Sequence, residues 1–190
     1  MANALTVLRL LLALPFAACM AAPDARSAAW AALILAAAIA SDVADGALAR
    51  RLGTASAAGR LLDHTADVLF VTSGLVAGAA RGAFPWILPV LVVAAFAQYA
   101  IDSYVVTRAR ELRPSRVGRY NGILYFVPLG GDIAVRLGGH ALRPLVSAVV
   151  WLLVASTLLS MGERLFLAVT ARRRRVPASP DGETRVRPPR

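Results

Sequence analysis

Four aspartates fall into two pairs, and the spacing within each pair is helical. Asp42 and Asp45 are three residues apart, and Asp63 and Asp67 are four apart, so each pair lies on one face of a helix. A short link separates the two segments. This spacing predicts two antiparallel neighbouring helices whose acidic faces meet in one small pocket.

Four ionised carboxylates in such a pocket repel one another. At about 5 Å and an effective dielectric constant near 20, each pair costs about 3 kcal/mol. Either several of them are protonated, or divalent cations neutralise them. The donors are oxygens, with only His64 nearby as a nitrogen donor, and this set favours Mg²⁺ or Mn²⁺. Two ions shared by four carboxylates would stabilise both the attacking and the leaving oxygen of a phosphoryl transfer. His64 is expected to support the metal ligands from behind or to pack between helices, rather than to bind metal itself.

The residues between the two pairs suit a phosphate ligand. Gly46 and Gly59 have no side chain to block close approach, and Arg50 can donate paired hydrogen bonds to phosphate oxygens. Ser56 adds a hydroxyl near Gly59. Each feature alone has a simpler explanation, because small residues pack transmembrane helices and Arg50 with Arg51 can be topological charges.

The elements that must position these residues are apolar. The chain has 190 residues, of which 58% are hydrophobic and 17% charged, against about half and about a quarter in soluble domains. The single cysteine, Cys19, excludes a disulfide scaffold. Apolar runs predict an all-α integral membrane bundle of six transmembrane helices. The runs are Ala4–Ala22, Ala28–Ala40, Val68–Ala80, Phe84–Ile101, Tyr120–Ala134 and Leu145–Met161.

The second, third and fifth runs are too short to cross a bilayer, and the shortfall of the second and third is informative. As a helix, Ala28–Ala40 rises only about 20 Å, so it must continue past its aspartates toward Arg50. Val68–Ala80 must begin upstream, near Leu61, and so includes the second pair. The four carboxylates are therefore predicted at or just below the membrane interface, facing a polar cavity in the bundle.

The basic residues indicate how the bundle is oriented. All 21 are arginines, the net charge is +10, and they concentrate in the connections after the second and fourth runs and after the sixth run. The positive-inside rule then predicts cytoplasmic termini and a site facing the cytoplasm. This distribution favours attraction to anionic membrane lipid, and we expect no nucleic-acid partner. Residues 1–171 are predicted to form one membrane domain, and residues 172–190 a disordered basic cytoplasmic tail.

The segment between the outermost aspartates resembles the signature of the CDP-alcohol phosphatidyltransferase family. It matches the signature at every fixed position, namely Asp42, Asp45, Gly46, Ala49, Arg50, Gly59, Asp63 and Asp67. Weaker similarities are Asn3-x-Leu5-Thr6-x2-Arg9 and Ser115-Arg116-x-Gly118-Arg119. The six-helix plan of the family also resembles the whole membrane portion.

The resemblance implies transfer of a phosphatidyl group from CDP-diacylglycerol to an alcohol, with release of CMP. Asp42, Asp45 and Asp63 would hold two divalent ions, and Asp67 would be the general base and also touch a metal. The nucleotide site would be formed by Asp42, Gly46, Ala49, Arg50, Ser56 and Gly59. The resemblance also implies a homodimer, and a location in the bacterial inner membrane.

The acceptor remains open at this point. Arg116 and Arg119 would hold the phosphate of glycerol 3-phosphate, the favoured acceptor, or of inositol phosphate, or they are topological charges alone. Serine and other headgroup alcohols are alternatives. An ion- or proton-coupled transporter is the alternative of another class, because intramembrane aspartates also serve as relays. Arg9, inside the first run, would extend to the headgroup level or contact the substrate.

Overall fold

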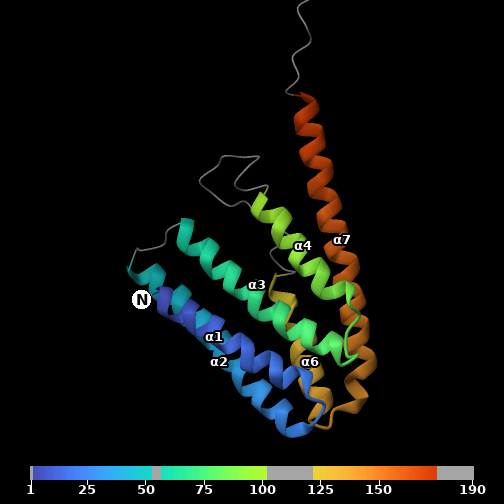
Figure 1. Cartoon of the computed structure of the whole chain (residues 1–190). Helices are drawn as coiled ribbons and strands as arrows, with labels where there is room; N and C mark the ends of the chain where they lie inside the picture. The colour runs from blue at the N-terminus through green and yellow to red at the C-terminus, as the bar shows by residue number, and fades with distance from the viewer. Residues whose placement is uncertain (1, 53–56, 102–121, 175–190) are drawn as a thin grey trace, which may run out of the picture.

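The computed structural model describes residues 2–52, 57–101 and 122–174, and every regular element in these ranges is a helix. The predicted all-α class is therefore confirmed. The elements, shown in Figure 1, are α1 (Ala2–Ala21), α2 (Ala25–Leu52), α3 (Ala57–Ala80), α4 (Ile87–Ile101), α6 (Phe126–Arg136), the 3₁₀ turn η2 (His140–Leu142) and α7 (Arg143–Arg174).

Two helices extend beyond their apolar runs, as the short runs require. α2 continues without a break through Asp42 and Asp45 to Leu52. α3 begins at Ala57 and carries Asp63 and Asp67 in its first half. The predicted helical continuation through both aspartate pairs is confirmed.

The start of α2 is fixed by a side-chain cap. Asp24 accepts hydrogen bonds from the backbone N–H of Ser27 at 2.9 Å and from the Ser27 hydroxyl at 2.8 Å. These hydrogen bonds hold the pKa of the exposed Asp24 carboxyl below its ordinary value. The cap lets the chain reverse between α1 and α2 within a short link.

The fifth apolar run is not one continuous helix. Residues 122–124 are helical, Tyr125 lies in a turn, and α6 begins at Phe126. Pro128 has no backbone N–H, so the carbonyl of Leu124 receives no helical hydrogen bond, and the helix is interrupted there. The Tyr125 hydroxyl lies 2.7 Å from the hydroxyl of Thr157 in α7, and this hydrogen bond ties the interruption to the longest helix.

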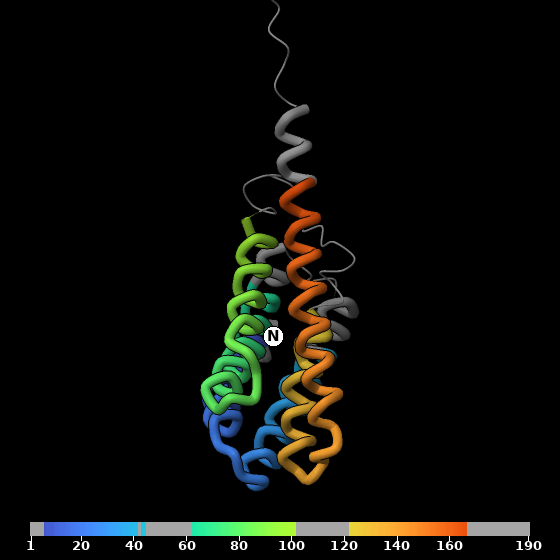
Figure 2. The backbone as a smooth tube through the Cα atoms, turned by 90° about the vertical axis from the view of Figure 1, so that its right-hand side faces the viewer, coloured from blue at the N-terminus to red at the C-terminus, as the bar shows by residue number. Residues whose placement is uncertain are grey.

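The helices pack around α1 and α3 on one side and α7 on the other. α1 packs against both α2 and α3, while α4 and α6 pack against α7. Figure 2 shows α4 and α7 lying side by side, with the turn from α6 into α7 at the same end as the link from α1 to α2. Both views also show the α3–α4 connection near that end.

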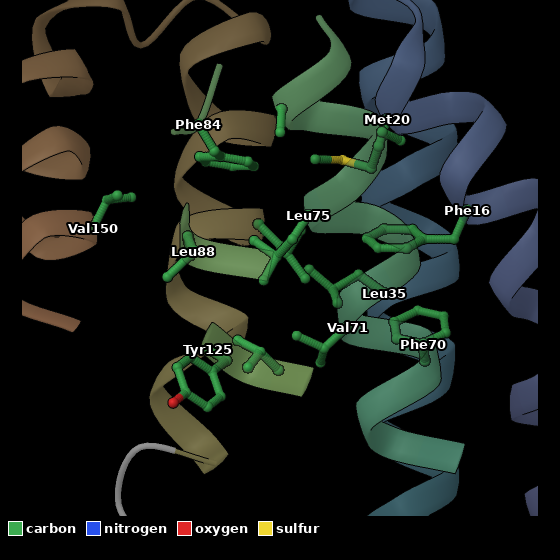
Figure 3. Packing of buried hydrophobic residues seen from close by; sticks show 14 of the residues in the cluster. Phe16, Met20, Leu35, Phe70, Val71, Leu75, Phe84, Leu88, Tyr125 and Val150 are labelled. Atoms are coloured by element: carbon green, nitrogen blue, oxygen red, sulfur yellow. The ribbon is translucent and has the colours of Figure 1, made fainter. Parts of the chain in front are cut away.

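The core between these helices is aromatic and aliphatic. The rings of Phe16 in α1 and Phe70 in α3 stack with centroids 4.5 Å apart and an interplanar angle of 14°. Leu75 and Leu88 continue the core toward α4 (Figure 3). Pro15 lies inside α1 and removes one backbone hydrogen bond from the middle of that helix.

The described residues contain one helical segment that is long and apolar enough to cross a membrane. It is His140–Phe166, with 27 residues and a mean hydropathy of 2.0. Thr6–Ala21, Ala25–Ser41 and Ile87–Ile101 are shorter apolar helices.

The close approach of α1 and α3 depends on Gly74. A Cβ at this position would lie 2.4 Å from Cε1 of Phe16 and 3.0 Å from Cδ2 of Leu129. At Gly130, in α6, an added Cβ would meet nothing within 4 Å. Alanine at Gly74 would therefore add a steric collision, whereas alanine at Gly130 would change only the helix propensity.

We predict opposite signs for alanine at these two glycines. Gly74→Ala should lower the free energy of unfolding by about 1–3 kcal/mol, because the methyl group collides with the Phe16 ring. Gly130→Ala should raise it by about 0.5–1 kcal/mol, because alanine favours the helix. Reversible unfolding in detergent measures both, and equal effects of the two substitutions would contradict this account of the α1–α3 contact.

Candidate active site

The second aspartate pair is held by the first helix. Thr6 in α1 donates its hydroxyl to Oδ1 of Asp63 at 2.5 Å. One turn further along α1, Nη1 of Arg9 forms a hydrogen-bonded ion pair with Oδ1 of Asp67. Thr6 and Arg9 are three apart and the aspartates four apart, so two turns of α1 face two turns of α3. The predicted common face of Asp63 and Asp67 is confirmed.

These contacts are shielded from water. The side chains of Thr6 and Arg9 are each 1% exposed, and that of Asp67 is 26% exposed. A buried guanidinium without a counter-charge is costly, and Asp67 supplies that charge. The side chain of Arg9 is therefore directed into the bundle toward α3. We call the end of the bundle with these four residues the aspartate end.

The first aspartate pair lies in the last part of α2. Asp42, Asp45, Gly46, Ala49 and Arg50 are all within that helix, and their side chains lie outside the described residues. The end of α2 and the start of α3 lie at the same end of the bundle in Figure 1. The two segments of the signature are thus at one end, and the predicted meeting of their side chains stays a prediction.

Other predicted site residues lie outside or at the edge of the described part. Gly59 is in the first turn of α3 with no side-chain environment described, and Ser56 lies outside the described residues. Arg116 and Arg119 also lie outside them. Their proposed contacts with nucleotide and acceptor are not tested by the structure.

His64 is exposed, and its ring contacts one aromatic side chain of a neighbouring helix. Its ring meets that of Tyr99 in α4 edge to face, with centroids 6.0 Å apart, and the guanidinium of Arg164 in α7 lies 5.4 Å from the Tyr99 centroid. Since each residue turns a helix by about 100°, His64 lies to one side of the face of Asp63 and Asp67. Its contact with Tyr99 connects α3 to α4 and, through Arg164, to α7.

The donor chemistry of the aspartate end fits a divalent metal ion. Among the side chains that the structure describes, no group of three or more metal-binding residues occurs, because only Asp63 and Asp67 of the four aspartates are included. The contacts from Thr6 and Arg9 both use Oδ1. A carboxylate has two oxygens and about four acceptor positions, so these contacts are compatible with metal coordination by the same groups.

Sequence reasoning missed Thr6 and Arg9 as the partners of the aspartates. Their signal was present in the motif Asn3-x-Leu5-Thr6-x2-Arg9 near the start of the chain. Helical spacing shows which residues share a face, but it does not show which face of a distant helix lies opposite.

The comparisons with known proteins bear on this arrangement. The model of the family described as CDP-alcohol phosphatidyltransferase matches residues 1–171. That range includes α1, both aspartate pairs and nearly all of α7. No significant match was found among curated proteins or among solved structures.

We predict that loss of Arg9 is costly because it leaves Asp67 without its cation. Arg9→Met should lower the free energy of unfolding by about 3 kcal/mol. Arg26→Met is the matched control, since Arg26 is exposed at the start of α2 and should change the stability by no more than about 0.5 kcal/mol. Unfolding in detergent, followed by circular dichroism, measures the difference, and similar losses in the two variants would show that the ion pair contributes nothing specific.

Proposed function

The chain belongs to the CDP-alcohol phosphatidyltransferase family, a family of transferases for phosphate-containing groups, and on that basis we propose a specific reaction for it. In this reaction the phosphatidyl group of CDP-diacylglycerol passes to a small alcohol, and CMP is released. Glycerol 3-phosphate is the acceptor we favour. The observation that carries the proposal is the convergence of Asp63 and Asp67 on Thr6 and Arg9 at the end of the bundle that also holds the rest of the signature.

We propose that the protein acts as an integral membrane bundle. The most apolar window of His140–Phe166 is only 28% buried inside the protein, whereas a core helix of a soluble protein is mostly buried. Large apolar side chains such as Leu14, Leu33, Leu152 and Leu159 are exposed by 61% or more. Lipid is the surrounding that removes such side chains from water. α1, with 20 residues, is about 30 Å long, the thickness of the hydrocarbon core.

In the proposed site, Asp67 takes the proton of the acceptor. The acceptor hydroxyl loses its proton to the Asp67 carboxylate, its oxygen forms a bond to the phosphatidyl phosphorus, and the bond from that phosphorus to the CMP oxygen breaks. Arg9 holds Oδ1 of Asp67, so the carboxylate keeps one orientation while the hydroxyl approaches. Arg50, by its place in the signature, would donate hydrogen bonds to the diphosphate.

Divalent metal ions are part of the chemistry of the family. We propose that Asp42, Asp45, Asp63 and Asp67 hold two ions, Mg²⁺ or Mn²⁺, which when bound offset the negative charge of the diphosphate. Thr6 orients Asp63 by its hydroxyl, and this hydrogen bond fixes one carboxylate oxygen on the α1 side. The arginines beside the aspartate end favour a cytoplasmic orientation for the site.

The first test of this proposal is CMP release. Purified protein with CDP-diacylglycerol, Mg²⁺ and an acceptor should release CMP, and Asp67→Asn should slow that release by about 10²–10⁴-fold because the amide cannot take the proton. Asp24→Asn is the control, since Asp24 caps α2 at the other end of α1 and asparagine also caps helices.

Two results would count against the proposal. Wild-type protein that releases no CMP with any acceptor would overturn the transfer reaction. Normal turnover in Asp67→Asn, with Asp24→Asn also normal, would leave the reaction standing but exclude Asp67 as the base.

A second prediction addresses the acceptor. Arg116→Ala and Arg119→Ala should raise the KM for glycerol 3-phosphate by about tenfold, with a smaller change in kcat, because a charged hydrogen bond to the acceptor phosphate is lost. Arg108→Ala, in the same arginine-rich connection, is the control and should leave the KM unchanged. Turnover of wild-type protein with serine but not with glycerol 3-phosphate would contradict the favoured acceptor.

A further inference from the structure

A second buried ionic cluster lies at the other end of α1 and α3. Arg81, directly after α3, donates from Nη2 to Oδ2 of Asp132 in α6 at 2.5 Å. Arg136, also in α6, has Nη1 at 3.7 Å from the same oxygen. Arg81 follows Asp67 by fourteen residues, so along α3 the two clusters are about 21 Å apart. We call this the arginine end.

The two arginines also bind the last turn of α1. Nε of Arg81 donates to the carbonyl of Met20 at 2.9 Å, and both Nη atoms of Arg136 donate to the carbonyl of Cys19 at 3.1 Å. Carbonyls in the last turn of a helix have no helical donor, and cations are favourable there. Both arginines are therefore fixed in place by the fold.

A cavity of about 390 Å³ opens beside this cluster. Its lining includes Arg81, Arg136, Asp132 and also Arg143, the first residue of α7. Three guanidinium groups against one carboxylate leave the lining with a net charge of +2. The side chain of Arg136 is 5% exposed, and its Nε is a buried donor with no acceptor in the part of the chain that the structure describes. Because buried donors are normally hydrogen-bonded, and a positively charged cavity attracts anions, an anionic acceptor fits this site.

The remaining wall of the cavity is apolar. Phe84, Val150 and Trp151 line it, and Trp151 is 56% exposed. Arg143 and Trp151 are eight residues apart in α7, about 12 Å along the helix, so the lining changes from basic to apolar over that distance. A free phosphate ion would use only the basic part of such a cavity. An amphiphile would use both parts, with its phosphate at Arg143 and its chain along Trp151.

We propose that this cavity binds the phosphate group of a phospholipid from the membrane leaflet opposite to the aspartate end. Its volume lies within the range of about 300–1,000 Å³ that is usual for small-molecule sites. A tryptophan at the edge of a lipid site fits the preference of this residue for the membrane interface. The proposal rests on the membrane location proposed above but not on the transfer reaction, so lipid binding and CMP release can fail independently.

Native mass spectrometry of the full-length protein in detergent tests the proposal. Titration with phosphatidylglycerol should give one bound lipid more per chain than titration with diacylglycerol of the same acyl chains, which has no phosphate. Arg143→Gln should weaken this binding about tenfold, because a charged hydrogen bond to the phosphate is lost. Arg26→Gln, which removes an exposed arginine outside the cavity lining, should leave it unchanged.

Ser147→Phe provides a second, independent variant, since Ser147 lines the cavity and a phenyl ring there would occupy it. We expect loss of the same bound lipid with unchanged helical circular dichroism. Equal retention of diacylglycerol, or unchanged lipid binding in both cavity variants, would overturn the proposal. Binding of inorganic phosphate that depends on Arg143, without any bound phosphatidylglycerol, would also overturn it and would assign the cavity to the free ion instead.

Discussion

The contact between α1 and α3 is the constraint on which the rest of the structure depends. At one end it consists of Thr6 with Asp63 and Arg9 with Asp67. In the middle the rings of Phe16 and Phe70 stack. Since buried polar groups need partners and apolar interiors pack closely, the two kinds of contact fix the same register between the helices. A shift by one turn would separate the charged pair and the stacked rings together.

The helices themselves were predictable because the signal is local. The two short apolar runs had to continue through charged residues, and α2 and α3 do so. The common face of Asp63 and Asp67 also follows from spacing alone. The interruption at Tyr125 was missed, since its cause is one missing backbone donor at Pro128 rather than a change in hydropathy.

The partners of the charged residues could not be predicted in the same way. Arg81, which follows α3, is hydrogen-bonded to Asp132, which is 51 residues away in sequence. Likewise, Arg9 and Asp67 are 58 residues apart. Spacing within one helix does not indicate which distant helix lies opposite. The packing of the core determines that neighbour. The meeting of Asp42 and Asp45 with the second pair remains a prediction.

Ionic clusters at both ends with an apolar middle are the arrangement that a bilayer favours. Charged groups cost least near the headgroups and most at the centre of the hydrocarbon core. The core residues between the clusters, among them Phe16, Leu75 and Leu88, are accordingly apolar and fully buried (Figure 3). Each cluster includes both signs of charge: Asp67 faces Arg9 at one end, and Asp132 faces Arg81 and Arg136 at the other.

Pro15 makes α1 easier to bend at one point, because the helix lacks one backbone hydrogen bond there. Beyond it, the helix is anchored through the carbonyls of Cys19 and Met20, whereas the arm before it ends in side chains that touch Asp63 and Asp67. Arg9 precedes Pro15 by six residues, or about 9 Å, so a bend of about 10° at the proline displaces the guanidinium by about 1.6 Å. A hydrogen bond does not survive such a displacement. A bend at Pro15 would therefore change the contact between Arg9 and Asp67 without changing the contacts of Cys19 and Met20.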